Sequence, residues 1–578
     1  MTKTIVRGFA AATFLAAIGC SSLDVANPNE PDNKRALADP NAIESVAAGS
    51  IRTWINAFTD LRGAGVMAVQ SRSYSSSWNN GNILTYVAVD NPTDPPDQWN
   101  RLTRAWRNDP ASSQRTSIDA FWSGGLDESA TPRGGFYNSL SSANDALSAI
   151  RKNGVVINNP SDTKRAETIA TFMQGASLMM FALSYDKAYI VTDSTTEAQL
   201  SSLTYSNRKV LRDTAVAKLK QAIALATANA FTTPASWTNG VSYTNVQIAQ
   251  IANTMAAMTL AYYPRDSTEL AGTDWAGIEA FTSNGMSSGT PVDFSFVQDG
   301  YASWISELMN WFGSIDTGRM HTRVAHLLDP ATQKDPWPAG GNPQPNSPDL
   351  RLGNGTFGNA GMVSSFGTKP KDAAAGTDYA WSATAIFRPS RGSYHQSNIA
   401  QIRYDYSGVQ DPQGTYGGYG PAPAISRNMN DLLWAEALLR QAKIGAKLFS
   451  LIDKTRVTRG GLPSSALNAV TGTTGDGPCM ANGKLASTGG ACSLWSVLLY
   501  EKEIELPGEG PSPFWEQRRL PVLVGGGWAG DNSPLRVIQG LLPGTPREQP
   551  VPYKELGVKG EDLYTWGGTG PAKSAPPP

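Results

Sequence analysis

Three glutamates near the end of the chain have the residue type and spacing of an acid–base site. Glu501, Glu505 and Glu509 recur at intervals of four residues, which places side chains on one face of a helix. Neighbouring carboxylates on such a face lie about 5–6 Å apart at Cβ. A glycosidase needs two carboxylates separated by roughly 5–5.5 or 6.5–9.5 Å according to its mechanism, so this geometry does not forbid one. A surface glycoside hydrolase that uses these glutamates is therefore one hypothesis.

The same stretch also has a structural interpretation. Pro507 lies inside the row of glutamates and breaks a helix, which leaves the last glutamate beyond it. Arg518 and Arg519 follow, and Arg456 and Arg459 come earlier in the chain. Arginine holds carboxylates through two parallel hydrogen bonds and suits partly buried clusters. We therefore favour a structural ion-pair cluster of the three glutamates with Arg518 and Arg519 over catalysis.

Other residue types that support catalysis or metal binding are sparse. The chain has only three histidines, at 321, 326 and 395, and they form no H-E-x-x-H pair. No G-x-S-x-G, phosphate-binding-loop or dinucleotide-binding pattern of the sequence lies in a plausible strand–helix unit. It therefore predicts neither a metal site nor a cofactor.

Charge and composition narrow the class of partner. The 578 residues include 48 basic and 49 acidic side chains, for a formal net charge of −1, and no dense basic run occurs. Nucleic-acid binders carry such runs, so nucleic acid is excluded as a partner. The chain is rich in tryptophan, with 16 residues, and this residue type favours ligand-binding and interface surfaces.

The first twenty residues predict export and lipid anchoring. Lys3 and Arg7 precede an apolar stretch that ends at Gly19–Cys20, which is the pattern of a secretory signal. A cysteine directly after a small residue at that point resembles a bacterial lipobox. We expect residues 1–19 to be a signal peptide, Cys20 to carry acyl chains that anchor the protein, and residues 20–41 to form a tether. An ordinary signal peptide that contains a cysteine is the alternative.

Besides Cys20, the chain has two cysteines, Cys479 and Cys492. They flank a short stretch rich in Gly, Ser and Ala. In an exported protein two such cysteines indicate a disulfide.

Periodicity predicts a mainly helical protein. Apolar residues recur with the 3.6-residue period of a helix over 136–152, 164–189, 211–230, 246–263 and 429–443. Residues 60–135 and 330–425 are instead dense in Gly, Pro, Ser, Asn and aromatic residues. Because disordered segments are poor in aromatic residues, we expect ordered loops there, laid over a helical scaffold.

Several motifs, in their order along the chain, resemble the SusD/RagB family of outer-membrane lipoproteins. The E-K-E-I-E-L-P-G-E-G stretch and the later F-W-E-Q-R-R resemble the family's closing region, with Lys502 in place of an arginine and Glu516 in place of an aspartate. Similar matches are FYNSLSSANDAL (136–147), LLWAEALLR (432–440), IDKTRVTRGGLP (452–463) and QPVPYKEL (549–556). Together they are spread over most of the chain.

The resemblance implies one domain over 42–578, with a tetratricopeptide-like scaffold of helix pairs at roughly 136–263 and 428–520 and a loop-rich, ligand-facing half. It implies a non-catalytic lipoprotein of the outer membrane, exposed at the cell surface. Such proteins capture oligosaccharides or peptides and pass them to a TonB-dependent β-barrel (SusC-like). A structural surface lipoprotein without a small ligand is a further alternative.

Aromatic residues of the loop-rich regions and their neighbourhood are the candidate ligand contacts, because flat sugar faces pack on aromatic rings. The candidates are Tyr74, Trp78, Trp99, Trp304, Trp311 and Trp337. Core packing is the alternative role for each of them.

Overall fold

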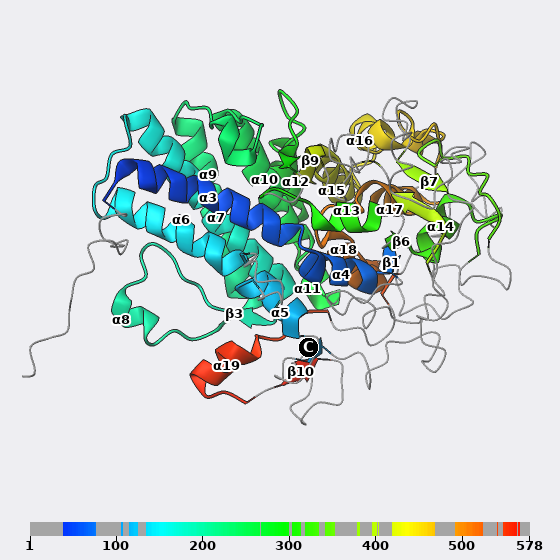
Figure 1. Ribbon diagram of the computed structural model, residues 1–578. Helices are drawn as coiled ribbons and strands as arrows, with labels where there is room; N and C mark the ends of the chain where they lie inside the picture. The colour runs from blue at the N-terminus through cyan, green and yellow to red at the C-terminus, as the bar shows by residue number, and fades with distance from the viewer. Residues whose placement is uncertain are drawn as a thin grey trace, which may run out of the picture.

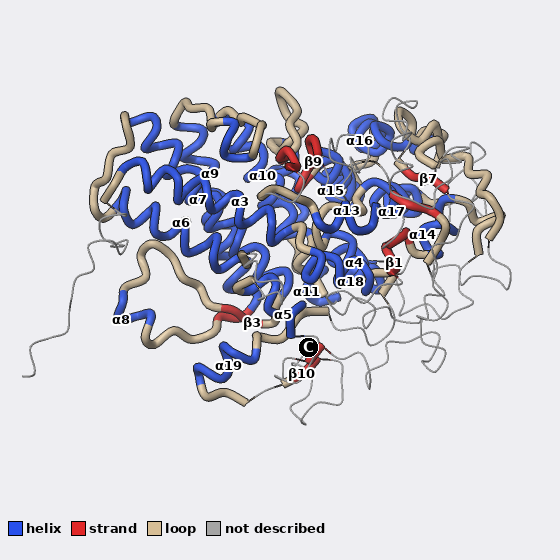
Figure 2. The backbone as a smooth tube through the Cα atoms, viewed as in Figure 1, coloured by secondary structure: helices blue, strands red, loops and turns tan. Residues whose placement is uncertain are grey.

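Helices make up most of the part of the chain that the computed structural model describes (Figure 2). The structure describes residues 38–76, 106–107, 115–124, 134–265, 267–299, 303–313, 318–334, 342–352, 378–381, 396–401, 403, 419–468, 492–523, 540–541, 547–562 and 564–566. Its main helices are α3 (Pro40–Phe58), α6 (Phe136–Arg151), α7 (Pro160–Ser184), α9 (Arg208–Ala228), α10 (Asn245–Ala261), α12 (Trp275–Ser283), α15 (Arg427–Arg440), α16 (Ala446–Arg456), α17 (Leu494–Glu505) and α18 (Ser512–Leu523).

Shorter helices and strand pairs complete the fold. The short helices are α4 (Val66–Gln70), α5 (Arg115–Trp122), α8 (Glu197–Leu200), α11 (Ser267–Ala271), α13 (Glu307–Gly313), α14 (Thr322–Leu328) and α19 (Tyr553–Lys559). The strands pair antiparallel in twos: β1 (Tyr74–Ser76) with β6 (Gly318–Met320), β2 (Trp106–Arg107) with β10 (Thr565–Trp566), β3 (Lys187–Ala188) with β4 (Ser206–Asn207), β5 (Phe294–Asp299) with β9 (Tyr419–Ile425), and β7 (Tyr379–Trp381) with β8 (Ile399–Gln401).

The long helices form an array in which each packs against its neighbours. Helix α7 packs on α3, α6 and α9, α10 joins α9 to α12, and α15 continues the array to α16 and α17. Figure 1 shows α3, α6, α7 and α9 in the left part of the view, and α13, α14, α16, α17 and α18 in the right part. The mainly helical fold expected from the periodicity is confirmed.

Local sequence explains why α7 can lie at the centre of this array. The Asn159 side chain accepts a hydrogen bond from the backbone N–H of Asp162 at 2.9 Å, and Pro160 occupies the first turn. From Ala166 onward every residue of the helix is buried. Gly175 allows α9 to approach closely, because a Cβ at that position would lie only 2.7 Å from Leu219 Cγ.

One boundary expected from the sequence is wrong. Residues 61–70, placed in a loop-rich region, form a π-helical turn (Leu61–Gly65) followed by α4, and all of them are buried. The Asp60 carboxylate accepts the N–H groups of Arg62 and Gly63 at 2.7 and 3.2 Å and so caps this element. Within the described residues, no helix combines the length and apolar character that crossing a membrane requires.

Candidate functional site

Helix α17 is buried although its last turn is charged. Glu501, Lys502, Glu503 and Glu505 each have at most 4% of their surface exposed. A buried charge is costly unless it is paired and hydrogen-bonded. The partners of these four side chains therefore decide what this stretch does.

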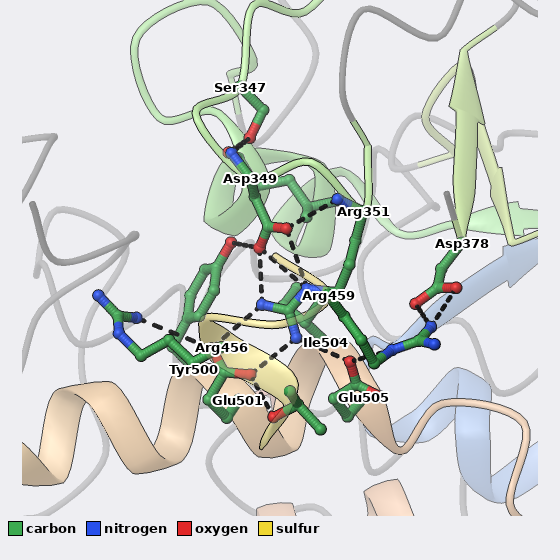
Figure 3. A network of polar contacts seen from close by, with 12 residues as sticks. Ser347, Asp349, Arg351, Asp378, Arg456, Arg459, Tyr500, Glu501, Ile504 and Glu505 are labelled. Carbon is green, nitrogen blue, oxygen red and sulfur yellow. Dashed lines mark hydrogen bonds and ion pairs between the residues drawn. The ribbon is translucent and has the colours of Figure 1, made fainter. Parts of the chain in front are cut away.

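Arg351 is the centre of the first set of contacts (Figure 3). Its guanidinium donates to Glu501 through Nη1 and Nη2, at 2.7 and 3.1 Å, and to Glu505 Oε1 through Nη1 at 2.9 Å. On its other side it pairs with Asp349, whose carboxylate also accepts the Tyr500 hydroxyl at 2.7 Å. All three carboxylates and the guanidinium are fully buried.

Three further arginines make the number of guanidinium groups in this cluster equal to the number of carboxylates. Arg403 Nη1 lies 2.7 Å from Glu505, and Arg459 contacts both Glu505 and Asp378. Arg456 lies 3.7 Å from Glu501. Within the described residues, the four guanidinium groups face the four carboxylates of Asp349, Asp378, Glu501 and Glu505. We call these eight residues the Arg351 cluster.

The two glutamates of the cluster respond differently to burial. Burial raises the pKa of Glu505, but Arg403, Arg351 and Arg459 together outweigh it and hold that pKa below its usual range. Burial raises the pKa of Glu501, and the opposing effect of Arg351 does not offset it. Glu505 is therefore the more firmly ionised of the pair.

The other faces of α17 are paired in the same way. Lys502 contacts the carboxylates of Glu436 and Glu516. Glu503 accepts from Arg323 Nη2 at 2.7 Å and from the Gln517 amide. The helix is thus held on three sides by charged partners.

Arg518 and Arg519, two adjacent residues of α18, connect this helix to the helical array. Arg518 donates to the carbonyls of Leu183 and Tyr262, where α7 and α10 end. A cation at the last carbonyls of a helix also interacts favourably with the helix dipole. Arg519 donates to the Ala261 carbonyl at 3.1 Å and to both oxygens of Glu436.

The pairing expected from the sequence is therefore wrong in its partners. Among the described residues, no ion pair joins Arg518 or Arg519 to Glu501, Glu505 or Glu509. Arg456 and Arg459, noted in the sequence, do contact the glutamates. The sequence did not indicate Arg351 and Arg403 as partners of these glutamates, because they lie about a hundred residues or more from α17 in the chain.

Glu509 has a separate role. Helix α17 ends at Glu505, as Pro507 predicts, and Glu509 lies in the following turn. Its carboxylate accepts the backbone N–H of Ser426, next to the start of α15, at 3.0 Å. Burial raises the pKa of Glu509 to about 7. Glu509 thus differs from Glu501 and Glu505, which share Arg351, both in its partner and in the pKa of its carboxyl.

This geometry does not fit the chemistry of a glycosidase. A catalytic carboxyl must lie within hydrogen-bond reach of the substrate, whereas Glu501, Glu505 and Glu509 have no exposed surface. Glu501 and Glu505 also share one guanidinium. The arrangement is that of a buried scaffold joining distant segments, not of a cleft that holds a sugar.

Known proteins resemble this chain in structure. No protein-family model and no curated sequence matches it. A SusD-like protein from Bacteroides fragilis NCTC 9343 aligns over 91% of this chain and 97% of its own, with a TM-score of 0.54 and 12% identity. The chain has the SusD-like fold. A SusD homolog from Bacteroides thetaiotaomicron VPI-5482 gives 0.51 at 12% identity, with 91% and 98% covered. A SusD superfamily protein from the same organism gives 0.50 at 13%, with 90% and 97% covered.

Within the SusD-like fold, the aromatic residues expected at a ligand have different positions. Tyr74 in β1 is fully buried, and its hydroxyl donates to Gln401 Oε1 at 2.5 Å, so it packs in the core. Trp304 is 6% exposed and lines a surface groove. The backbone of Trp311 lies in α13. Trp78, Trp99 and Trp337 lie outside the described residues, as does Cys20.

Of the two cysteines expected to form a disulfide, only Cys492 lies within the residues that the structure describes. Cys492, two residues before α17, is disulfide-bonded and 1% exposed. Cys479 lies outside the described residues. In the part of the chain that the structure describes, no group of histidine, cysteine and acidic side chains is arranged to hold a metal ion.

Proposed function

We propose that this protein is a non-catalytic lipoprotein of the outer membrane that captures oligosaccharides or peptides and passes them to a TonB-dependent transporter. The observation that carries the proposal is the SusD-like fold, which matches a solved SusD-like protein over 91% of this chain and 97% of that one. The leader that ends at Gly19–Cys20 supports export and lipid anchoring.

Ligand capture is tested with the purified full chain against panels of neutral and acidic oligosaccharides and short peptides. Because the chain has 16 tryptophans, their fluorescence reports binding, and calorimetry confirms it. We expect at least one ligand to bind without being cleaved. Failure of both panels would favour a structural surface lipoprotein. Release of reducing sugar, abolished by Glu505→Gln in a protein that still folds, would favour a hydrolase.

Anchoring and partnership require separate experiments. We expect Cys20→Ala to move the protein from the membrane fraction to the soluble fraction. Affinity purification of the wild-type protein from its native membranes should retain a TonB-dependent β-barrel. Membrane attachment of Cys20→Ala would contradict the lipid anchor, and repeated absence of any such barrel would contradict the partnership.

A further inference from the structure

A surface groove of about 490 Å³ lies along the outer face of α3. Its lining includes Glu44, Ala48, Gly49 and Arg52 of this helix. The opposite face of α3 is buried through residues such as Ile43, Ala47 and Ile51. The volume falls within the range of roughly 300–1,000 Å³ that ligand sites occupy.

The two ends of the groove have different chemistry. At one end Arg165, from α7, pairs with Glu44 and lies over the Trp237 ring at 5.4 Å from its centroid. At the other end are Arg52 and Trp304 of the lining. That end is fixed by the segment before α13, whose Ser303 carbonyl accepts the Asn56 amide at 3.1 Å.

The floor between these ends is kept open by small residues. Ala48 and Gly49 lie there, and a Cβ added to Gly49 would meet no atom within 4 Å. Glycine inside a helix is destabilising relative to alanine. Packing against the protein therefore does not require glycine at this position, and a large side chain there would enter the groove.

Arg52 is a charged residue of the groove without an ion-pair partner among the described residues. Its guanidinium is exposed, and it makes no hydrogen bond or ion pair with another described residue. By contrast, Arg165 is already paired with Glu44 and Asp162. A guanidinium presents a planar fork of donors that matches a carboxylate. The Glu44 carboxylate and the serine hydroxyls of the lining suit the hydroxyl groups of a sugar.

We propose that this groove binds an acidic saccharide, with a sugar carboxylate on Arg52 and sugar hydroxyls along Glu44 and the open floor at Gly49. Trp237 and Trp304 are each only 6% exposed, so their rings form walls, and charge and hydrogen bonding provide the recognition. This inference rests on the proposed function of ligand capture and adds a substrate class and a site to it.

Calorimetry with the purified full chain tests the site. The probes are trigalacturonate, the neutral galactotriose and a sulfated galactose trisaccharide. We expect trigalacturonate to bind at least about ten-fold more tightly than galactotriose, because a charged partner left unpaired is costly. Tighter binding of the sulfated probe would identify sulfate as the anion and overturn the carboxylate assignment.

Two substitutions examine the groove itself. Gly49→Leu fills the floor and should abolish trigalacturonate binding, while the melting temperature stays equal or rises, since leucine favours helix. Arg52→Gln should weaken trigalacturonate binding by about ten-fold and leave galactotriose unaffected. The matched controls are Gly557→Leu, a helical glycine that also has open space around it, and Lys152→Gln, an exposed cation; both should bind as the wild type does.

The outcomes separate this site from the broader proposal. Wild-type binding of trigalacturonate by Gly49→Leu would overturn the groove as the site. If the panels yield a neutral ligand and trigalacturonate does not bind, ligand capture stands and this inference fails. If no saccharide or peptide binds at all, both fail.

Discussion

Arg351 and Glu505 are joined by a hydrogen bond of 2.9 Å across 154 positions of the sequence, and both side chains are fully buried. This contact fastens a loop from the middle of the chain to α17. Desolvation favours loss of charge for both groups, yet the carboxylates around Arg351 hold its pKa above its usual value. The pair therefore stays ionised inside the protein.

Replacing Arg351 should destabilise the fold strongly. Arg351→Met keeps much of the side-chain volume but leaves the buried carboxylates of Asp349 and Glu501 without their main partner. Removing one partner of a buried ion pair costs about 3–5 kcal/mol, and urea unfolding followed by circular dichroism measures this loss. Lys209→Ala is the control, because its partner Asp213 and Lys209 itself are both exposed, and it should cost at most about 1 kcal/mol. Equal losses would contradict the role assigned to the Arg351 cluster.

Conversion to glutamine should change the free energy of unfolding by different amounts at Glu505 and Glu509. Glu505→Gln removes the charge that faces Arg351, Arg403 and Arg459, so we expect a loss of about 3–5 kcal/mol at neutral pH. The glutamine of Glu509→Gln resembles the protonated acid, so this change should leave the free energy of unfolding almost unchanged at pH 5. Urea unfolding of the two variants at that pH compares them directly, and a Glu509→Gln loss as large as that of Glu505→Gln would contradict the distinction.

The pH dependence of Glu509→Gln gives a further test. The folded pKa of Glu509, about 7, lies above its ordinary value of 4.5, so the folded state binds this proton more tightly than the unfolded state. Its contribution to stability is complete below pH 4.5 and is lost as the pH rises to about 7. The free energy of unfolding of the wild type, relative to that of the variant, should fall by up to about 3 kcal/mol over this range. A difference in free energy of unfolding that stays constant between pH 4 and pH 8 would contradict the raised pKa of Glu509.

The glycine that follows Glu509 is required by geometry. Gly510 has a φ of +56°, and a Cβ there would lie 2.4 Å from ring atoms of Phe58. We expect Gly510→Ala to cost about 3 kcal/mol, from the left-handed backbone together with overpacking. Gly560→Ala is the matched control, since Gly560 has a φ of +66° but nothing within 4 Å. Thermal melts should show a clearly smaller loss for Gly560→Ala.

Tyr564 should hold the C-terminal segment against the helical array. Its hydroxyl donates to an oxygen of the partly buried Asp186 carboxyl at 3.0 Å and accepts the Val551 N–H at 2.9 Å. Tyr564→Phe leaves both groups without this partner, which should cost about 1–3 kcal/mol. Hydrogen exchange over residues 547–562 should speed up. Tyr553→Phe, whose hydroxyl has no hydrogen bond to another described residue, should leave that exchange unchanged.

The sequence alone determined the local elements, because their causes lie within a few residues. The apolar period over 246–263 predicted α10 to within two residues at each end, and Pro507 predicted that α17 ends before Glu509. The order of the short motifs also led to the SusD-like fold, since each motif marks a helix or turn of that scaffold.

Only the tertiary structure decided what the charged residues contact. Arg518 and Arg519 lie near the glutamates in sequence but point to the ends of α7 and α10. Glu501 and Glu505 instead share Arg351, about 150 residues away. The same holds for the groove at Gly49, which exists because α7, the Trp237 turn and the Trp304 segment meet on α3. Pairing of buried charges depends on which distant segments pack together, and spacing along one helix carries no information about that.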